Sequence, residues 1–307
     1  MTSNKPEARY GSAVIPYLAD MYKQLYIRPA EDALEEYRAV VLAGEEPASR
    51  SLSHFIMNEQ DSAVFEETPA GPVLAVTLYE RKDFETFLQI IANKCRPVMI
   101  PATQGATLLD GVISWNKINA RRDAYLKEAE ASGEEADWDG EFARFTSVKS
   151  NYTDVMLVLS AGPYSAVDGS EFGIEEAQWL KDSLAIRKYH ELNHFICRKL
   201  WPEKISAVWD ELVADAVGIY AAYGDYDLPM AERFLGIRDG VYTGGRLENY
   251  VEEADPVKKK ETLNRLAERI HPILCSFDEV IKAHAGITPF ELVKVLEDLY
   301  KGDITAD

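Results

Sequence analysis

The chain has 307 residues, with 52 acidic and 33 basic side chains and a formal net charge of −19. Such an acidic protein repels phosphate backbones, which argues against nucleic-acid binding. Hydrophobic residues make up 47% of the chain, enough for a sizeable core in one large domain or two lobes, and no apolar run approaches the roughly 20 residues that cross a membrane.

The first part of the chain is predicted to be mainly helical. Residues 1–60 carry helical patterns, and Ala30–Leu42 forms a good amphipathic segment. Val64–Tyr79 is a predicted β-hairpin, because the turn-forming residues Pro69-Ala70-Gly71-Pro72 lie between an extended run and the alternating Val73–Leu78. The chain therefore enters a sheet at this hairpin.

Helix and strand alternate in the next segments. We predict a helix over Asp83–Asn93, a short strand over Pro97–Ile100, a strand or a loop over Gly105–Ile113, and a helix over residues 115–131. The stretch Ala131–Asp137 is small and acidic and is predicted to be an exposed loop. This mixture indicates an α+β protein.

Asp154–Ser160 is the clearest strand in the sequence. Its continuous apolar run favours a central place in the sheet. The Gly162-Pro163 turn follows, and a long helix is predicted from near Ser170–Gly173 to Leu200. This long helix carries the most informative motif of the chain.

The motif is HExxH, spelled by His190-Glu191-Leu192-Asn193-His194. Two histidines four residues apart project from one face of a helix, so both imidazoles can bind one ion. Glu191 lies about 100° round the helix from His190, where its carboxylate misses the ion but can reach a water molecule held there. This is the position of a general base.

A third ligand is predicted on the following helix. From His194 the first helix runs about six residues, roughly 9 Å, before Trp201-Pro202 turns the chain. A return helix that starts near Lys204 or Ile205 brings Glu211 back by about the same distance. His190, His194 and Glu211 then form a ligand set known for catalytic zinc.

Asp215 lies one helical turn beyond Glu211, where it could accept the remaining N–H of a ligand imidazole, with His190 favoured. With the sequence Glu211-Leu212-Val213-Ala214-Asp215, the region His190–Asp215 resembles the gluzincin, or thermolysin-like, branch of the zincin metallopeptidases. The resemblance implies that His190, His194 and Glu211 bind Zn²⁺, that Glu191 is the base and acid, and that Asp215 orients a ligand.

The expected fold is α+β and zincin-like. A sheet-containing lobe over residues 1–200 would include the HExxH helix, and a helical lobe over residues 201–307 would supply Glu211, unless the chain is a single domain. In zincins the edge of the sheet binds extended substrate. If Asp154–Ser160 is a central strand, the predicted hairpin or the Gly105 segment would bind the substrate instead.

Thr288-Pro289-Phe290-Glu291 is a capping box that should open a last helix, ending near Lys301.

The expected activity is zinc-dependent hydrolysis, with a peptide or a small amide as the substrate. Zinc would activate water, and Glu191 would pass its proton to the leaving amine. A further donor should stabilise the oxyanion. Tyr242, in the loop Gly240–Gly245, is our candidate, and Arg246, Tyr250 and His271 are the others.

Two other interpretations stay open from the sequence. The chain could be a zincin-like scaffold that binds zinc, or has lost it, and acts in protein interaction; alternatively the helix residues could be structural only. Glu191 favours hydrolysis, because a purely structural zinc site has no use for a general base.

The remaining expectations concern location and cysteines. No N-terminal segment resembles a signal peptide, so a cytoplasmic location is expected, without a membrane or nucleic-acid partner. Cys95, Cys197 and Cys275 are odd in number and lack CxxC spacing, so we expect them to be reduced. The oligomeric state is not predicted.

Overall fold

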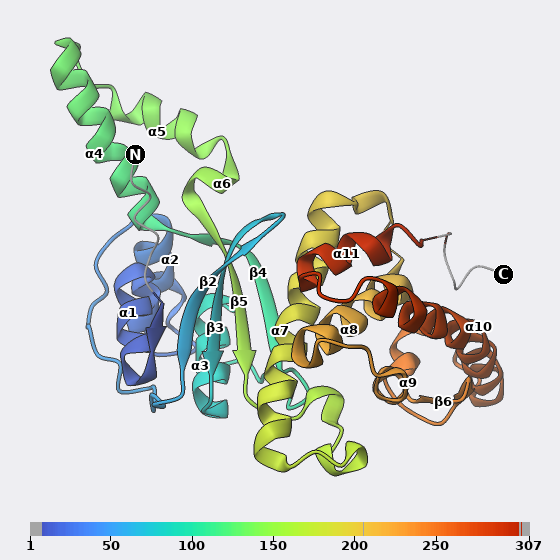
Figure 1. Ribbon diagram of the computed structural model, residues 1–307. Helices are drawn as coiled ribbons and strands as arrows, with labels where there is room; N and C mark the ends of the chain where they lie inside the picture. Colours follow the sequence, from blue (N-terminus) through green and yellow to red (C-terminus); the bar gives the residue numbers. More distant parts are fainter. Residues whose placement is uncertain (1–7, 205, 301, 303–307) are drawn as a thin grey trace. The chain divides into compact units, whose positions relative to one another are not determined.

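A computed structural model describes residues 8–204, 206–300 and 302. The chain forms two compact units. The first contains the residues up to Ser160 apart from 68–71, and the second contains 68–71 and the residues from Ala161 onward. The protein is mixed α and β, as the sequence predicts (Figure 1). In the described part of the chain, no helix is both long and apolar enough to cross a bilayer.

The first unit contains a five-stranded sheet with the order β1-β2-β3-β5-β4. Strand β5 is parallel to β3 and antiparallel to β4, so its predicted central position is confirmed. The hairpin is formed by β2 and β3, and the segment predicted as strand or loop is the strand β4. The strands are β1 (Arg9–Tyr10), β2 (Ser62–Thr68), β3 (Gly71–Leu78), β4 (Ala106–Ile113) and β5 (Thr153–Ser160).

Helices and sheet share one apolar core in this unit. Val14 and Leu18 from α1, Phe84 and Phe87 from α3, and Met156 from β5 are buried in it. The helices α4 and α5 extend away from the sheet (Figure 1). The helices of this unit are α1 (Val14–Met21), α2 (Leu34–Leu42), α3 (Arg81–Ile91), α4 (Trp115–Ser132), α5 (Trp138–Thr146) and α6 (Lys149–Tyr152).

The predicted strand over Pro97–Ile100 is wrong. These residues pair with no other strand, and the Met99 side chain is 91% exposed. Pro97 and Pro101 lack the backbone N–H that a paired strand donates, which disfavours pairing at both ends of this segment. Its apolar composition alone was therefore not sufficient to predict a strand.

The second unit is mainly helical. Its helices are α7 (Glu176–Leu200), α8 (Ala207–Tyr223), α9 (Leu228–Leu235), α10 (Pro256–Ala283) and α11 (Pro289–Glu297), and β6 (Ile237–Arg238) and β7 (Val241–Tyr242) form a small hairpin. Helix α7 ends at Leu200, directly before Trp201-Pro202, as predicted. The capping box at Thr288 and Glu291 is present and opens α11. Residues 205 and 301, which we named as helix ends, lie outside the described residues.

The two units divide after Ser160 and not near residue 200, so α7 belongs with the helical unit. The reason is that α7 packs against α8 (Figure 1). Both helices bury apolar side chains, such as Leu192 on α7 and Val213 on α8. Gly218 permits a close approach, because a Cβ atom there would lie 2.7 Å from the backbone oxygen of Ile186. The helix pair is therefore held partly by backbone contact.

Candidate metal centre

The HExxH residues lie on α7 as predicted, with both histidines buried. The Nε2 atoms of His190 and His194 are 3.0 Å apart, so the two imidazoles converge on one point. Glu191, between them in sequence, is half-buried. Its carboxylate forms no hydrogen bond or ion pair among the residues that the structure describes, which leaves it free to accept a proton.

Helix α8 brings Glu211 to the same point. Glu211 Oε1 lies 3.6 Å from His190 Nε2, and Glu211 Oε2 lies 3.8 Å from His194 Nε2. The three side chains are buried, and one ligand atom of each lies within 4.8 Å of the others. They form a cluster that could hold a metal ion. The helix hairpin expected from the Trp201-Pro202 turn thus places Glu211 level with the imidazoles.

Each imidazole is supported by a carboxylate on its outer side. His190 Nδ1 lies 2.9 Å from Asp215 Oδ1, the contact expected from the sequence. His194 Nδ1 lies 2.7 Å from Asp210 Oδ2, a contact that the sequence analysis missed. A carboxylate accepts the Nδ1–H of a neutral imidazole, which leaves the Nε2 lone pair directed at the ion. The only sequence signal for Asp210 is that it directly precedes Glu211.

Asp210→Asn is expected to weaken the binding of added zinc, used as a probe ion, by roughly 10–100-fold, because the neutral amide is a poorer acceptor for the His194 N–H. Competition with a fluorescent zinc indicator measures the change. Asp278→Asn, which removes a carboxylate paired with Lys282 on α10, is the matched control and should bind zinc like the wild type. Equal affinities for both variants would show that Asp210 does not support the cluster.

Tyr164 completes the support around His190. Its hydroxyl donates to Asp215 Oδ1 at 2.7 Å and lies 2.8 Å from His190 Nδ1. The residue follows β5 in a turn held on α7 by the Ser183 hydroxyl, which accepts the Tyr164 N–H at 2.9 Å. Ser165 and Ala166 continue this turn with φ angles of 54° and 56°, in the left-handed region. Such strained backbone is costly and is concentrated at functional sites.

Arg246 is a half-buried cation beside the cluster. Its Nη1 lies 3.0 Å from Glu211 Oε1 and donates to the Tyr164 hydroxyl at 3.1 Å, and its Nη2 pairs with Asp215. Burial alone would raise the pKa of Asp215, but Arg246 and His190 outweigh burial and hold that pKa well below its usual range. Asp215 therefore stays ionised.

Tyr250 is hydrogen-bonded to the Glu211 side chain, and burial together with the Glu211 charge raises the pKa of its phenol. Arg246 and Tyr250 lie in the 3₁₀ segment Arg246–Tyr250. The structure therefore brings two of the four oxyanion candidates against a predicted ligand.

The other two candidates have partners elsewhere. The Tyr242 hydroxyl donates to Glu248 and accepts the Gly245 N–H, and burial and Glu248 raise its pKa to about 12. His271 Nδ1 lies 2.7 Å from Glu232 Oε1. Of the four candidates, Arg246 and Tyr250 are therefore the two that contact the cluster, through Glu211.

Fold and site together define a mixed α/β protein with a buried His-His-Glu cluster on two antiparallel helices, a candidate metal centre. The chain belongs to a family of unknown function, DUF7005, which matches residues 12–301. No curated protein and no solved structure matches the chain. The function must therefore be inferred from the site itself.

Proposed function

We propose that the chain is a zinc-dependent hydrolase, with peptides or small amides as substrates. One observation carries the proposal. The Nδ1 atoms of His190 and His194 each contact a carboxylate, and their Nε2 atoms lie 3.0 Å apart beside Glu211. With each Nδ1–H donated to a carboxylate, both Nε2 atoms can bind one cation together with Glu211.

Zinc suits this donor set. Zinc bonds of about 2.0–2.1 Å in a tetrahedron separate neighbouring ligand atoms by about 3.3 Å. The distances of 3.0, 3.6 and 3.8 Å among the donors of His190, His194 and Glu211 lie around that value. Three protein ligands leave a fourth position open, which is typical of catalytic sites and not of structural ones.

The reaction assigns a role to each neighbouring side chain. Zinc, when bound, would supply a Lewis acid that makes water nucleophilic and polarises a carbonyl group. Glu191, whose carboxylate is free, takes the proton of the attacking water and transfers it to the departing amine. Tyr250 or Arg246, both against Glu211, donates to the oxygen on which negative charge develops. We prefer these residues to Tyr242, which is engaged by Glu248.

Removal of the metal tests the proposal. The purified full chain should contain zinc at near-equimolar amount by mass spectrometry. It should cleave members of a panel of peptides and small amides. A zinc chelator should abolish cleavage, and added zinc, but not added magnesium, should restore it, because the donor set contains two nitrogens. Cleavage that continues after complete removal of the metal would refute a zinc mechanism.

A further inference from the structure

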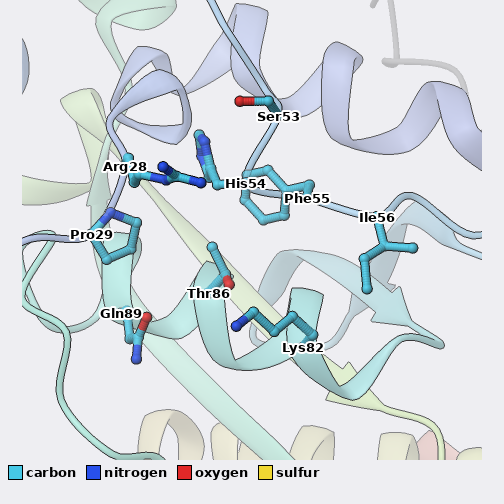
Figure 2. A pocket seen from close by; sticks show the side chains of 9 residues that line it. All are labelled: Arg28, Pro29, Ser53, His54, Phe55, Ile56, Lys82, Thr86 and Gln89. Carbon is cyan, nitrogen blue, oxygen red and sulfur yellow. The ribbon is translucent and has the colours of Figure 1, made fainter.

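A second candidate site lies in the first unit, in a cavity of about 360 Å³. Figure 2 shows its walls, which come from three parts of the chain: Arg28 and its neighbour, the segment from Ser53 to Ile56, and one face of α3. Lys82 and Thr86 lie on that face, one helical turn apart. A cavity of this size is in the range of small-molecule sites.

The charge of this cavity is opposite to that of the protein. Its nine lining residues include Arg28 and Lys82 but neither Asp nor Glu, although the chain carries 52 acidic residues. Within the described residues, neither Arg28 nor Lys82 forms an ion pair. Both side chains are exposed, and two cations without an ion-pair partner among these residues, at the wall of one cavity, attract an anion.

The walls of the cavity are held in place before any ligand binds. Asp83, fully buried on α3, accepts the backbone N–H groups of Ile56 at 2.8 Å and of Met57 at 2.7 Å. These bonds fix the segment from Ser53 to Ile56 on the helix, and Met57 takes a φ of 67°, in the left-handed region. A preorganised wall reduces the entropy that a ligand must overcome.

His54 adds an acceptor to the cavity. Its Nε2 lies 2.9 Å from the Leu25 carbonyl oxygen, which can only accept, so Nε2 carries the proton. Burial and the nearby Arg28 lower the pKa of His54, so the ring is neutral and its Nδ1 is an acceptor. The Thr86 side chain, 5% exposed, adds a hydroxyl group. The cavity thus offers two cations, hydroxyl donors and the apolar ring of Phe55.

We propose that this cavity binds a small phosphorylated molecule, with its phosphate group between Arg28 and Lys82. A phosphate monoester carries about −1.5 to −2 charges at neutral pH. This charge balances two cations more closely than the single negative charge of a carboxylate ligand does. The fork of an Arg guanidinium fits phosphate oxygens, and Lys binds phosphate as a point charge. Phe55 and Pro29 provide apolar surface for the organic part. The proposal is independent of the zinc site, which lies in the other unit.

Titration calorimetry with phenyl phosphate tests the site on the full-length protein. Wild type should bind, and Arg28→Gln/Lys82→Gln should bind about 100-fold more weakly, or roughly tenfold for each lost charge-assisted contact. Arg38→Gln/Lys127→Gln is the matched control, since it removes the same two charges from exposed positions in the same unit. It should stay within about twofold of wild type, because exposed distant charges are screened by salt.

Three outcomes would overturn the proposal. Wild type that gives no binding at millimolar phenyl phosphate would exclude the site. An equal loss of affinity in both double variants would show a general charge effect and no defined pocket. Benzoate that binds as tightly as phenyl phosphate would contradict the assignment to phosphate. If phenyl phosphate bound at the zinc cluster instead, Arg28→Gln/Lys82→Gln would bind it like the wild type, so this double variant distinguishes the two sites.

Discussion

Glu191→Gln should slow hydrolysis strongly and leave zinc bound. The amide cannot accept a proton, and general base catalysis contributes about 10²–10⁴-fold to rate, so we expect a loss of roughly a thousandfold in kcat. Zinc should be retained because Glu191 does not contribute to the cluster of His190, His194 and Glu211. A base acts only on the chemical step, so KM should change little.

The measurement is initial rate on the best peptide or amide found by screening, with zinc content determined on the same samples. Glu176→Gln, an exposed change at the start of α7, is the matched control and should keep wild-type activity. If Glu191→Gln retained full activity, the catalytic assignment would fail. A wild type that bound zinc but cleaved nothing would favour the interaction scaffold.

His190→Ala and Glu211→Ala should each lose zinc. Either change leaves two protein ligands, and the affinity should fall by more than the roughly 10–100-fold expected for Asp210→Asn. In Glu211→Ala, Arg246 also loses a carboxylate partner at 3.0 Å, so some destabilisation of the 3₁₀ segment is expected as well.

Mass spectrometry of the purified variants measures this loss directly, and thermal unfolding with and without added zinc shows whether the variants are folded. His284→Ala and Glu279→Ala, both at exposed positions, are the controls and should contain zinc like the wild type. Stoichiometric zinc in His190→Ala would mean that the ion is bound elsewhere. Wild type without zinc, even after incubation with it, would refute the proposed centre.

The cluster could be predicted from sequence because local rules determine it. Helical periodicity places His190 and His194 on one face, and the proline after Trp201 limits the first helix. The chain then turns back, and α8 brings Glu211 level with them, although it begins at Ala207 and not near Lys204 as expected. These rules need no knowledge of the rest of the fold. They therefore predict the cluster even though the two units divide after Ser160 and not near residue 200.

The surroundings of the cluster depend on long-range packing, which no local pattern reports. Tyr164 reaches His190 through a turn with left-handed residues at Ser165 and Ala166, neither of which is a glycine that would signal such a turn. Asp210 contacts His194 through the packing of α8 against α7. The cationic cavity likewise joins Arg28 to Lys82, which are distant in sequence.

The contact between Gly218 and Ile186 has a consequence for how this protein can evolve. The spacing of α7 and α8 is set by apolar side chains and by main-chain contact, and none of these features depends on the ligands of the ion. Substitutions at the ligands should therefore leave the scaffold standing. In evolution, a substitution at His190, His194 or Glu211 should remove the candidate metal centre and keep the helix pair, whereas a residue larger than glycine at position 218 should disturb both the helix spacing and the cluster.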